Sequence, residues 1–117
     1  NNALFLRNDW EANVQMTKNE KREHSDVLYQ AILTLRDLDE CKKFFSDLCT
    51  VAELRAMEQR FEVAMLLSDG MIYNDILERT GASSATISRV NRSLQYGADG
   101  YQAVLPRIKE QMDQHGV

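Results

Sequence analysis

The stretch YNDILERTGASSATISRVNRSL, residues 73–94, limits most strongly what this chain can fold into. It predicts two short helices joined by a tight turn at Thr80-Gly81-Ala82, because glycine adopts the left-handed backbone that such a turn needs. The second helix would open with the small, hydroxyl-rich residues 83–86. This layout is typical of a helix-turn-helix, whose second helix enters the major groove of DNA.

The second helix of this motif has one apolar face. Ile87, Val90 and Leu94 recur at i, i+3 and i+7, which places them on one side of a helix. We expect Ile76 and Leu77 of the first helix to face them. The outward positions form the predicted DNA-binding surface: Asn74 on the first helix and Ser83, Ser84, Ala85, Thr86, Ser88, Arg89 and Arg92 on the second.

These outward residue types suit DNA. Small and hydroxyl side chains allow close approach to base edges, the helix N-terminus favours a phosphate, and arginine can contact phosphate or guanine. The alternative is an ordinary helical hairpin with a polar outer face.

Length and composition favour one all-α domain. The chain has 117 residues, 44 % of them hydrophobic, with five glycines and one proline, and helix-forming residues are common. The net charge of −4 is unfavourable for a DNA-binding protein, whose affinity depends on phosphate contacts. Residues 70–96 carry three arginines against two acids, so we expect modest, salt-sensitive binding helped by a second subunit.

Helical spacing extends over the rest of the chain. Residues 25–48 predict two helices with a break near Leu38-Asp39. Thr50 and Glu53 have the spacing of a capping box, which would begin a helix that ends at about Ser68.

The later helices have predicted boundaries as well. The first motif helix would have Tyr73 or Asn74 as its N-cap, and the second would have Ser83 or Ser84. A last helix follows Gly100, and its proline at position 106 would kink it or begin a new helix.

The chain has no Met at its first position, and Met16 would make a natural start. We therefore expect residues 1–15 to be a leader or tag-derived segment and residues 16–117 to be the domain. Cys41 and Cys49 are expected to be free thiols of a cytoplasmic protein. No apolar run reaches the length of a membrane span, so no membrane is expected as a partner.

The segments FFSDLCTVAELRAMEQR and ASSATISRVNRSL, and the distance between them, resemble the tryptophan repressor superfamily, in particular the TrpR-related YerC/YecD family. The resemblance implies an all-α, Trp-repressor-like six-helix domain with a helix-turn-helix. It further implies an intertwined homodimer, in which the N-terminal helices of two copies interlock. Two recognition helices would then lie about one DNA turn apart, roughly 34 Å.

The resemblance also implies a ligand site. In that family, tryptophan lies between the helix that begins here at Thr50 and the recognition helix. Arg60 and Arg89 fill the two arginine positions that enclose the indole, and Ser93 fills the position that holds the amino group. Thr50 matches the family's threonine at the start of the preceding helix and completes the expected ligand-binding set. However, Val90 stands where the family has a glycine, and overpacking a tight site costs about 1–3 kcal/mol. We therefore hypothesise that Val90 replaces the corepressor; the alternative is a shifted pocket for another small ligand.

A second departure concerns the first motif helix. It lacks the basic residues of the family and carries Asn74, Asp75 and Glu78 instead, which weakens the expected phosphate binding. An operator sequence therefore does not carry over from the family.

The sequence thus predicts a sequence-specific transcription regulator that binds double-stranded DNA as a homodimer, without tryptophan as corepressor. No catalytic residue, cofactor or metal site is expected, because His24 and His115 are isolated and have no metal-ligand spacing with the cysteines. Two alternatives stay open. One is a helical protein-interaction module that has lost DNA binding, and the other is a repressor that responds to an unknown small-molecule effector.

Overall fold

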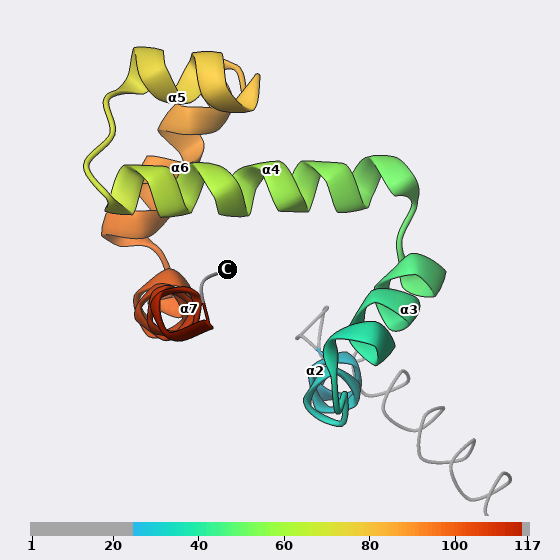
Figure 1. The fold of residues 1–117 in the computed structure, drawn as a ribbon. Coiled ribbons are helices and arrows are strands. Elements are labelled where there is room, and N and C mark those ends of the chain that lie inside the picture. The colour runs from blue at the N-terminus through green and yellow to red at the C-terminus, as the bar shows by residue number, and fades with distance from the viewer. Residues whose placement is uncertain (1–24, 116–117) are drawn as a thin grey trace, which may run out of the picture. The chain divides into compact units, whose positions relative to one another are not determined.

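The computed structural model describes residues 25–115, and all regular elements within them are helices. They are α2 (Asp26–Leu33), α3 (Leu38–Leu48), α4 (Val51–Ser68), α5 (Tyr73–Thr80), α6 (Ser84–Tyr96) and α7 (Gly100–His115) (Figure 1). The chain divides into two units, one that ends at Leu48 and one that begins at Cys49. The predicted all-α class with six helices is confirmed, whereas the expected leader at residues 1–15 lies outside the described residues.

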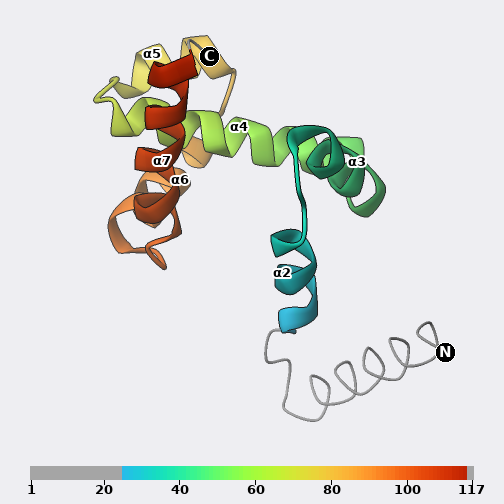
Figure 2. The same cartoon turned by 60° about the horizontal axis from the view of Figure 1, so that its bottom comes forward.

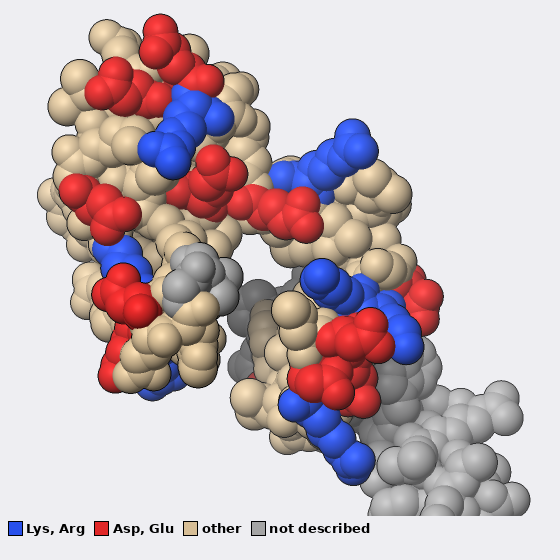
Figure 3. All heavy atoms as spheres, in the orientation of Figure 1, with Lys and Arg blue, Asp and Glu red and all other residues tan. Residues whose placement is uncertain are grey.

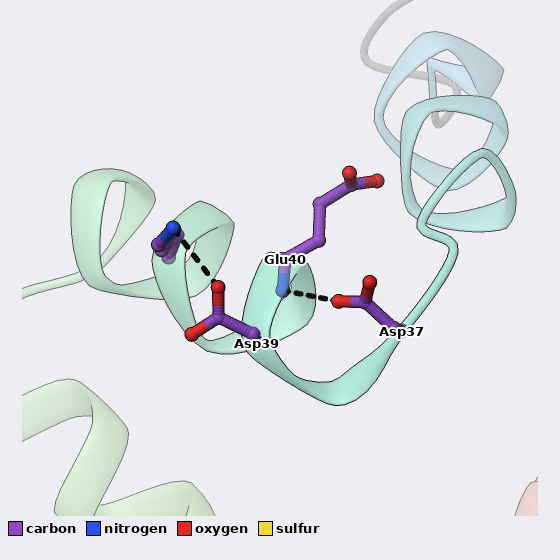
Figure 4. Close-up of polar contacts among 4 residues, drawn as sticks. Asp37, Asp39 and Glu40 are labelled. Carbon is purple, nitrogen blue, oxygen red and sulfur yellow. Dashed lines mark hydrogen bonds and ion pairs between the residues drawn. The ribbon is translucent and has the colours of Figure 1, made fainter.

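The first unit contains α2 and α3, separated by residues 34–37. The predicted break near Leu38-Asp39 is therefore placed too late. The helix starts earlier than predicted because Asp37 caps its first turn. Asp37 Oδ1 accepts a hydrogen bond from the Glu40 amide at 2.8 Å (Figure 4). Asp39, expected to interrupt the helix, instead forms an exposed i,i+4 ion pair with Lys43 at 2.9 Å.

Apolar side chains of the first unit remain uncovered. None of its described residues is buried, and Leu33 and Leu38 are 83 % and 71 % exposed. The rings of Phe44 and Phe45 meet edge to face, with centroids 5.4 Å apart. This helix pair therefore has no core of its own among the residues that the structure describes.

The second unit has a small core built around the C-terminal half of α4. In the two views of the ribbon, α5, α6 and α7 gather at that end of α4 (Figures 1 and 2). The buried side chains of the described residues all belong to this unit and are apolar: Val63, Ala64, Ile76, Ala82, Ile87, Val90 and Leu105. The core thus joins α4 to the two helices of the motif and to α7.

α7 runs without interruption through Pro106, which the sequence predicted to be a kink or a helix start. Leu105 is buried, and Tyr101 and Ile108 pack against the core on either side of the proline. This packing holds the helix together across the missing amide hydrogen bond. Lys109 adds a polar connection, because its Nζ lies 2.8 Å from Asp69 Oδ1 at the end of α4.

Glycine and the capping residues fix the helix ends of this unit. Gly70 has φ +87° directly after the C-cap of α4, the left-handed conformation in which helices commonly end. A Cβ on Gly97, the C-cap of α6, would collide with the Ser93 carbonyl oxygen, so α6 ends here only with glycine. The N-cap of α5 is Ile72, not Tyr73 or Asn74, because the amides of Asp75 and Ile76 bond to the Ile72 carbonyl.

The predicted capping box at the start of α4 is confirmed. Thr50 Oγ1 accepts from the Glu53 amide at 3.1 Å, and Glu53 Oε1 accepts from the Thr50 amide at 2.8 Å. The Thr50 backbone amide, and after it the Thr50 side chain, lower the pKa of the Glu53 carboxyl, because a hydrogen bond donated to the carboxylate favours its charged form.

We expect Thr50→Ala to lower the free energy of unfolding by about 1 kcal/mol at neutral pH, because the cap hydroxyl is lost. The contribution of Glu53 is present above the ordinary pKa of a glutamate and is lost as the pH falls through its lowered folded-state value. Urea titrations at several pH values would measure both effects. Thr50→Ser keeps the hydroxyl and should match the wild type; equal stability of Thr50→Ala would contradict the role of the cap.

Candidate nucleic-acid interface

The turn between α5 and α6 is held by its own backbone and one threonine. Gly81 has φ +72°, and its amide donates to the Leu77 carbonyl at 2.9 Å. Thr80 Oγ1 donates to the Ile76 carbonyl at 2.7 Å and accepts from the Ala82 amide at 3.1 Å. The expected tight turn with a left-handed glycine is present as predicted.

The start of α6 is capped by Ser83, which decides between the two serines proposed. Ser83 Oγ accepts from the Thr86 amide at 3.1 Å and lies 3.1 Å from Thr86 Oγ1. Both hydroxyls are thus engaged in starting the helix. Ser83 uses its hydroxyl proton in the bond to Thr86 Oγ1, whereas the Thr86 hydroxyl keeps its own proton to donate to a phosphate oxygen.

The inner and outer faces of α6 are clearly separated. Ile87 and Val90 are 0 % and 2 % exposed, and Leu94 packs against the core, as the apolar stripe predicted. The predicted outward residues that are exposed on α6 are Ser84, Ala85, Ser88, Arg89 and Arg92. Thr86 is half-buried, and Asn74 is exposed on α5.

One inward prediction on α5 is wrong. Leu77 is 42 % exposed, whereas Ile76 is fully buried. The helix turns by 100° per residue, and it is Thr80, one turn after Ile76, that follows it on the inner side.

Tyr96 is a residue of the outer face that sequence reasoning missed. It is 81 % exposed and lies four and seven positions after Arg92 and Arg89 on α6. The same helical spacing that selected the arginines would have included it.

The outer side of α5 carries little positive charge. Asn74, Asp75 and Glu78 are exposed there, and Arg79 is its single cationic residue. In Figure 3, acidic side chains lie beside basic ones at the end of the unit where α5 is found. Any attraction for phosphate must therefore come mainly from α6.

The four predicted ligand-binding residues are not brought into one pocket. Arg60 and Arg89 line a pocket of about 280 Å³ between α4 and α6, together with Ala56, Gln59, Ala85 and Thr86. Ser93 lines a separate pocket of about 400 Å³ beside Phe61, Tyr101 and Val104. Thr50 is occupied in the capping box. Among the described residues, no cluster of histidine, cysteine or acidic side chains could hold a metal ion.

Comparisons with known proteins identify relatives of this chain. The sequence model of the Trp repressor protein family matches residues 23–109. YerC of Bacillus subtilis strain 168, an uncharacterized protein, is 53 % identical over 85 residues, which cover 73 % of this chain and 82 % of YerC.

Two crystal structures share the fold. A TrpR-like protein from Eubacterium eligens ATCC 27750 is 56 % identical with a TM-score of 0.70, and the match covers 73 % of this chain and 88 % of that one. A proposed Trp repressor from Staphylococcus aureus is 48 % identical with a TM-score of 0.72, covering 77 % and 92 %. The chain belongs to the Trp repressor protein family, as its sequence motifs predicted.

We expect Gly81→Ala to destabilise the protein by about 1–2 kcal/mol, because a side chain at φ +72° strains the backbone even though the space around it is open. Gly100→Ala is the matched control, since this position is also open and begins α7 without a positive φ. It should be neutral or slightly stabilising. Thermal unfolding of both variants measures the difference; equal melting temperatures would contradict the role of Gly81 in the turn.

Proposed function

We propose that this member of the Trp repressor family is a dimeric, sequence-specific transcription regulator, and not an enzyme, that acts in the cytoplasm without tryptophan as corepressor. The observation that carries the proposal is the division of α6. Its inner face is buried in the core, while Ala85, Ser88, Arg89 and Arg92 are exposed on the outer face. A helix held by a scaffold with such a free face is suited to enter a major groove.

The chemistry of this face fits duplex DNA. Small side chains at 84, 85 and 88 let the helix approach base edges, where direct or water-mediated contacts can form. Arg89 and Arg92 can contact phosphates or guanine. Asn74 and Ser83 are proposed as further contacts at the edge of the groove, with Thr86 beside them.

The uncovered first unit supports the homodimer. A helix pair without a buried residue among those described cannot provide the packing that stabilises helices in proteins. A second copy would cover the exposed apolar residues of α2 and α3, in the manner of the interlocked N-terminal helices of the family. Dimerisation also doubles the number of arginines facing DNA, which offsets the acidic charge of the chain.

The buried Val90 supports a regulator without tryptophan. This side chain is 2 % exposed and belongs to the core that joins α4 to α6. The protein itself therefore fills space beside the recognition helix.

Among residues 25–115, none of the helices has the length and apolar character that a membrane-spanning helix needs.

Two other functions have specific observations in their favour. The acidic outer side of α5 favours a protein-interaction module that no longer binds DNA. The pocket between Arg60 and Arg89 favours a repressor that responds to a small acidic effector, because two guanidinium groups border it. A gel shift with random duplexes at low salt, followed by rounds of selection, distinguishes a DNA-binding regulator from a protein-interaction module.

We expect Arg89→Ala to weaken binding to the selected duplex roughly tenfold or more. Loss of one phosphate contact from each subunit should also reduce the slope of log K against log salt by about 2. Titrations at several salt concentrations measure both quantities. Arg107→Ala, an exposed arginine on α7, is the matched control and should bind like the wild type.

Light scattering should show twice the 13.5 kDa chain mass for the wild type and for both variants. Unchanged DNA affinity of a dimeric Arg89→Ala protein would count against α6 as the reading helix.

We expect no binding of L-tryptophan in the micromolar range, because Val90 occupies the space that the family's glycine leaves open. Isothermal titration calorimetry with L-tryptophan measures this, and D-tryptophan serves as the control for non-specific heats. A micromolar dissociation constant for the L-isomer would overturn the corepressor-free mechanism.

A further inference from the structure

Gln59 connects α4 to the turn of the helix-turn-helix. Its side chain is partly buried, and its Nε2 donates a hydrogen bond to the Thr80 carbonyl oxygen at 3.2 Å. That carbonyl belongs to the last residue of α5, and the last carbonyls of a helix have no partner within the helix. Gln59 therefore provides the bond that the end of α5 needs, from a residue 21 positions earlier in the chain.

This hydrogen bond constrains the orientation of the motif on α4, which the apolar contacts of the core do not. Val63, one turn after Gln59 on α4, packs with Ile87 and Val90 through apolar contacts. The hydrophobic effect is non-directional, so such contacts alone tolerate small displacements of α6 along α4. A hydrogen bond restricts both the distance and the angle between its partners.

The connection continues into the start of α6. Thr80 receives the bond from Gln59 on its carbonyl, and its hydroxyl accepts from the Ala82 amide. Ala82 is itself buried, directly before Ser83, the N-cap of α6. Gln59 thus acts through Thr80 on the segment that sets where the recognition helix begins.

We propose that Gln59 is a positioning residue that fixes the helix-turn-helix on α4, so that α6 is set for DNA without a bound effector. The inference rests on the proposed function. Gln59 also lines the pocket between Arg60 and Arg89, while its amide joins α4 to the end of α5.

Gln59→Met tests the proposal, because methionine keeps the length of the side chain and removes the amide. Without the bond, fewer molecules hold the binding-competent arrangement, and the apparent affinity falls in proportion to that fraction. We expect binding to the selected duplex to weaken about two- to tenfold, the loss that one net hydrogen bond would give. In the free protein, the amides of Gly81 and Ala82 should exchange with solvent faster than in the wild type.

Gln102→Met is the matched control. Its Nε2 also donates to a main-chain carbonyl, that of Leu94 at 3.4 Å, but the bond joins α7 to α6 and does not reach the turn. This variant should keep the wild-type affinity and the wild-type exchange at Gly81 and Ala82.

Wild-type exchange at both amides in Gln59→Met would overturn the inference, as would the same acceleration in Gln102→Met. Faster exchange with unchanged DNA affinity would overturn the role in positioning α6. If the wild type bound no selected duplex, the proposed function would fail, and the exchange rates in the free protein would still decide whether Gln59 holds the turn.

Discussion

The contact between the C-terminal half of α4 and the inner face of α6 is the interaction on which the second unit depends. Val63 and Ala64 meet Ile87 and Val90 there, and all four are almost completely buried. The same contact supports the turn through Ala82 and α7 through Leu105. Because the core is small, each of these side chains contributes a large share of the apolar area removed from water. The placement of α6, the helix proposed to face DNA, and the stability of the fold therefore have the same physical origin.

The sequence predicted most of this arrangement because its signals are local. The capping box at Thr50 and Glu53, the left-handed Gly81 and the apolar stripe of α6 each depend on neighbouring residues and were identified correctly. The errors arose where two readings of a local pattern competed. The break predicted near Leu38-Asp39 lies inside the helix that Asp37 caps, and Leu77 was expected to face inward although only Ile76 is buried.

Other features could not be read from local patterns. The hydrogen bond from Gln59 to Thr80 depends on how α4 crosses the motif, which spacing along the chain does not encode. For the same reason, matching single residues to the family could not show which of them share a pocket. Arg60 and Arg89 line one pocket, and Ser93 lines another. Pro106 belongs to the same class, because packing on both sides of it decides that α7 continues.

Because the two faces of α6 are separate, its exposed residues can change during evolution without changing its buried ones. Ser84, Ala85 and Ser88 are exposed and contribute nothing to the core, so their replacement has little effect on folding. Ile87 and Val90, which alternate with them along the helix, cannot change without opening a cavity or overfilling the core. With α6 as the proposed reading helix, duplicated copies of such a gene can therefore acquire new base preferences at the exposed positions while the fold stays under constant selection. On the proposed function, such a helix provides a surface on which recognition of a new operator can evolve with few effects on stability.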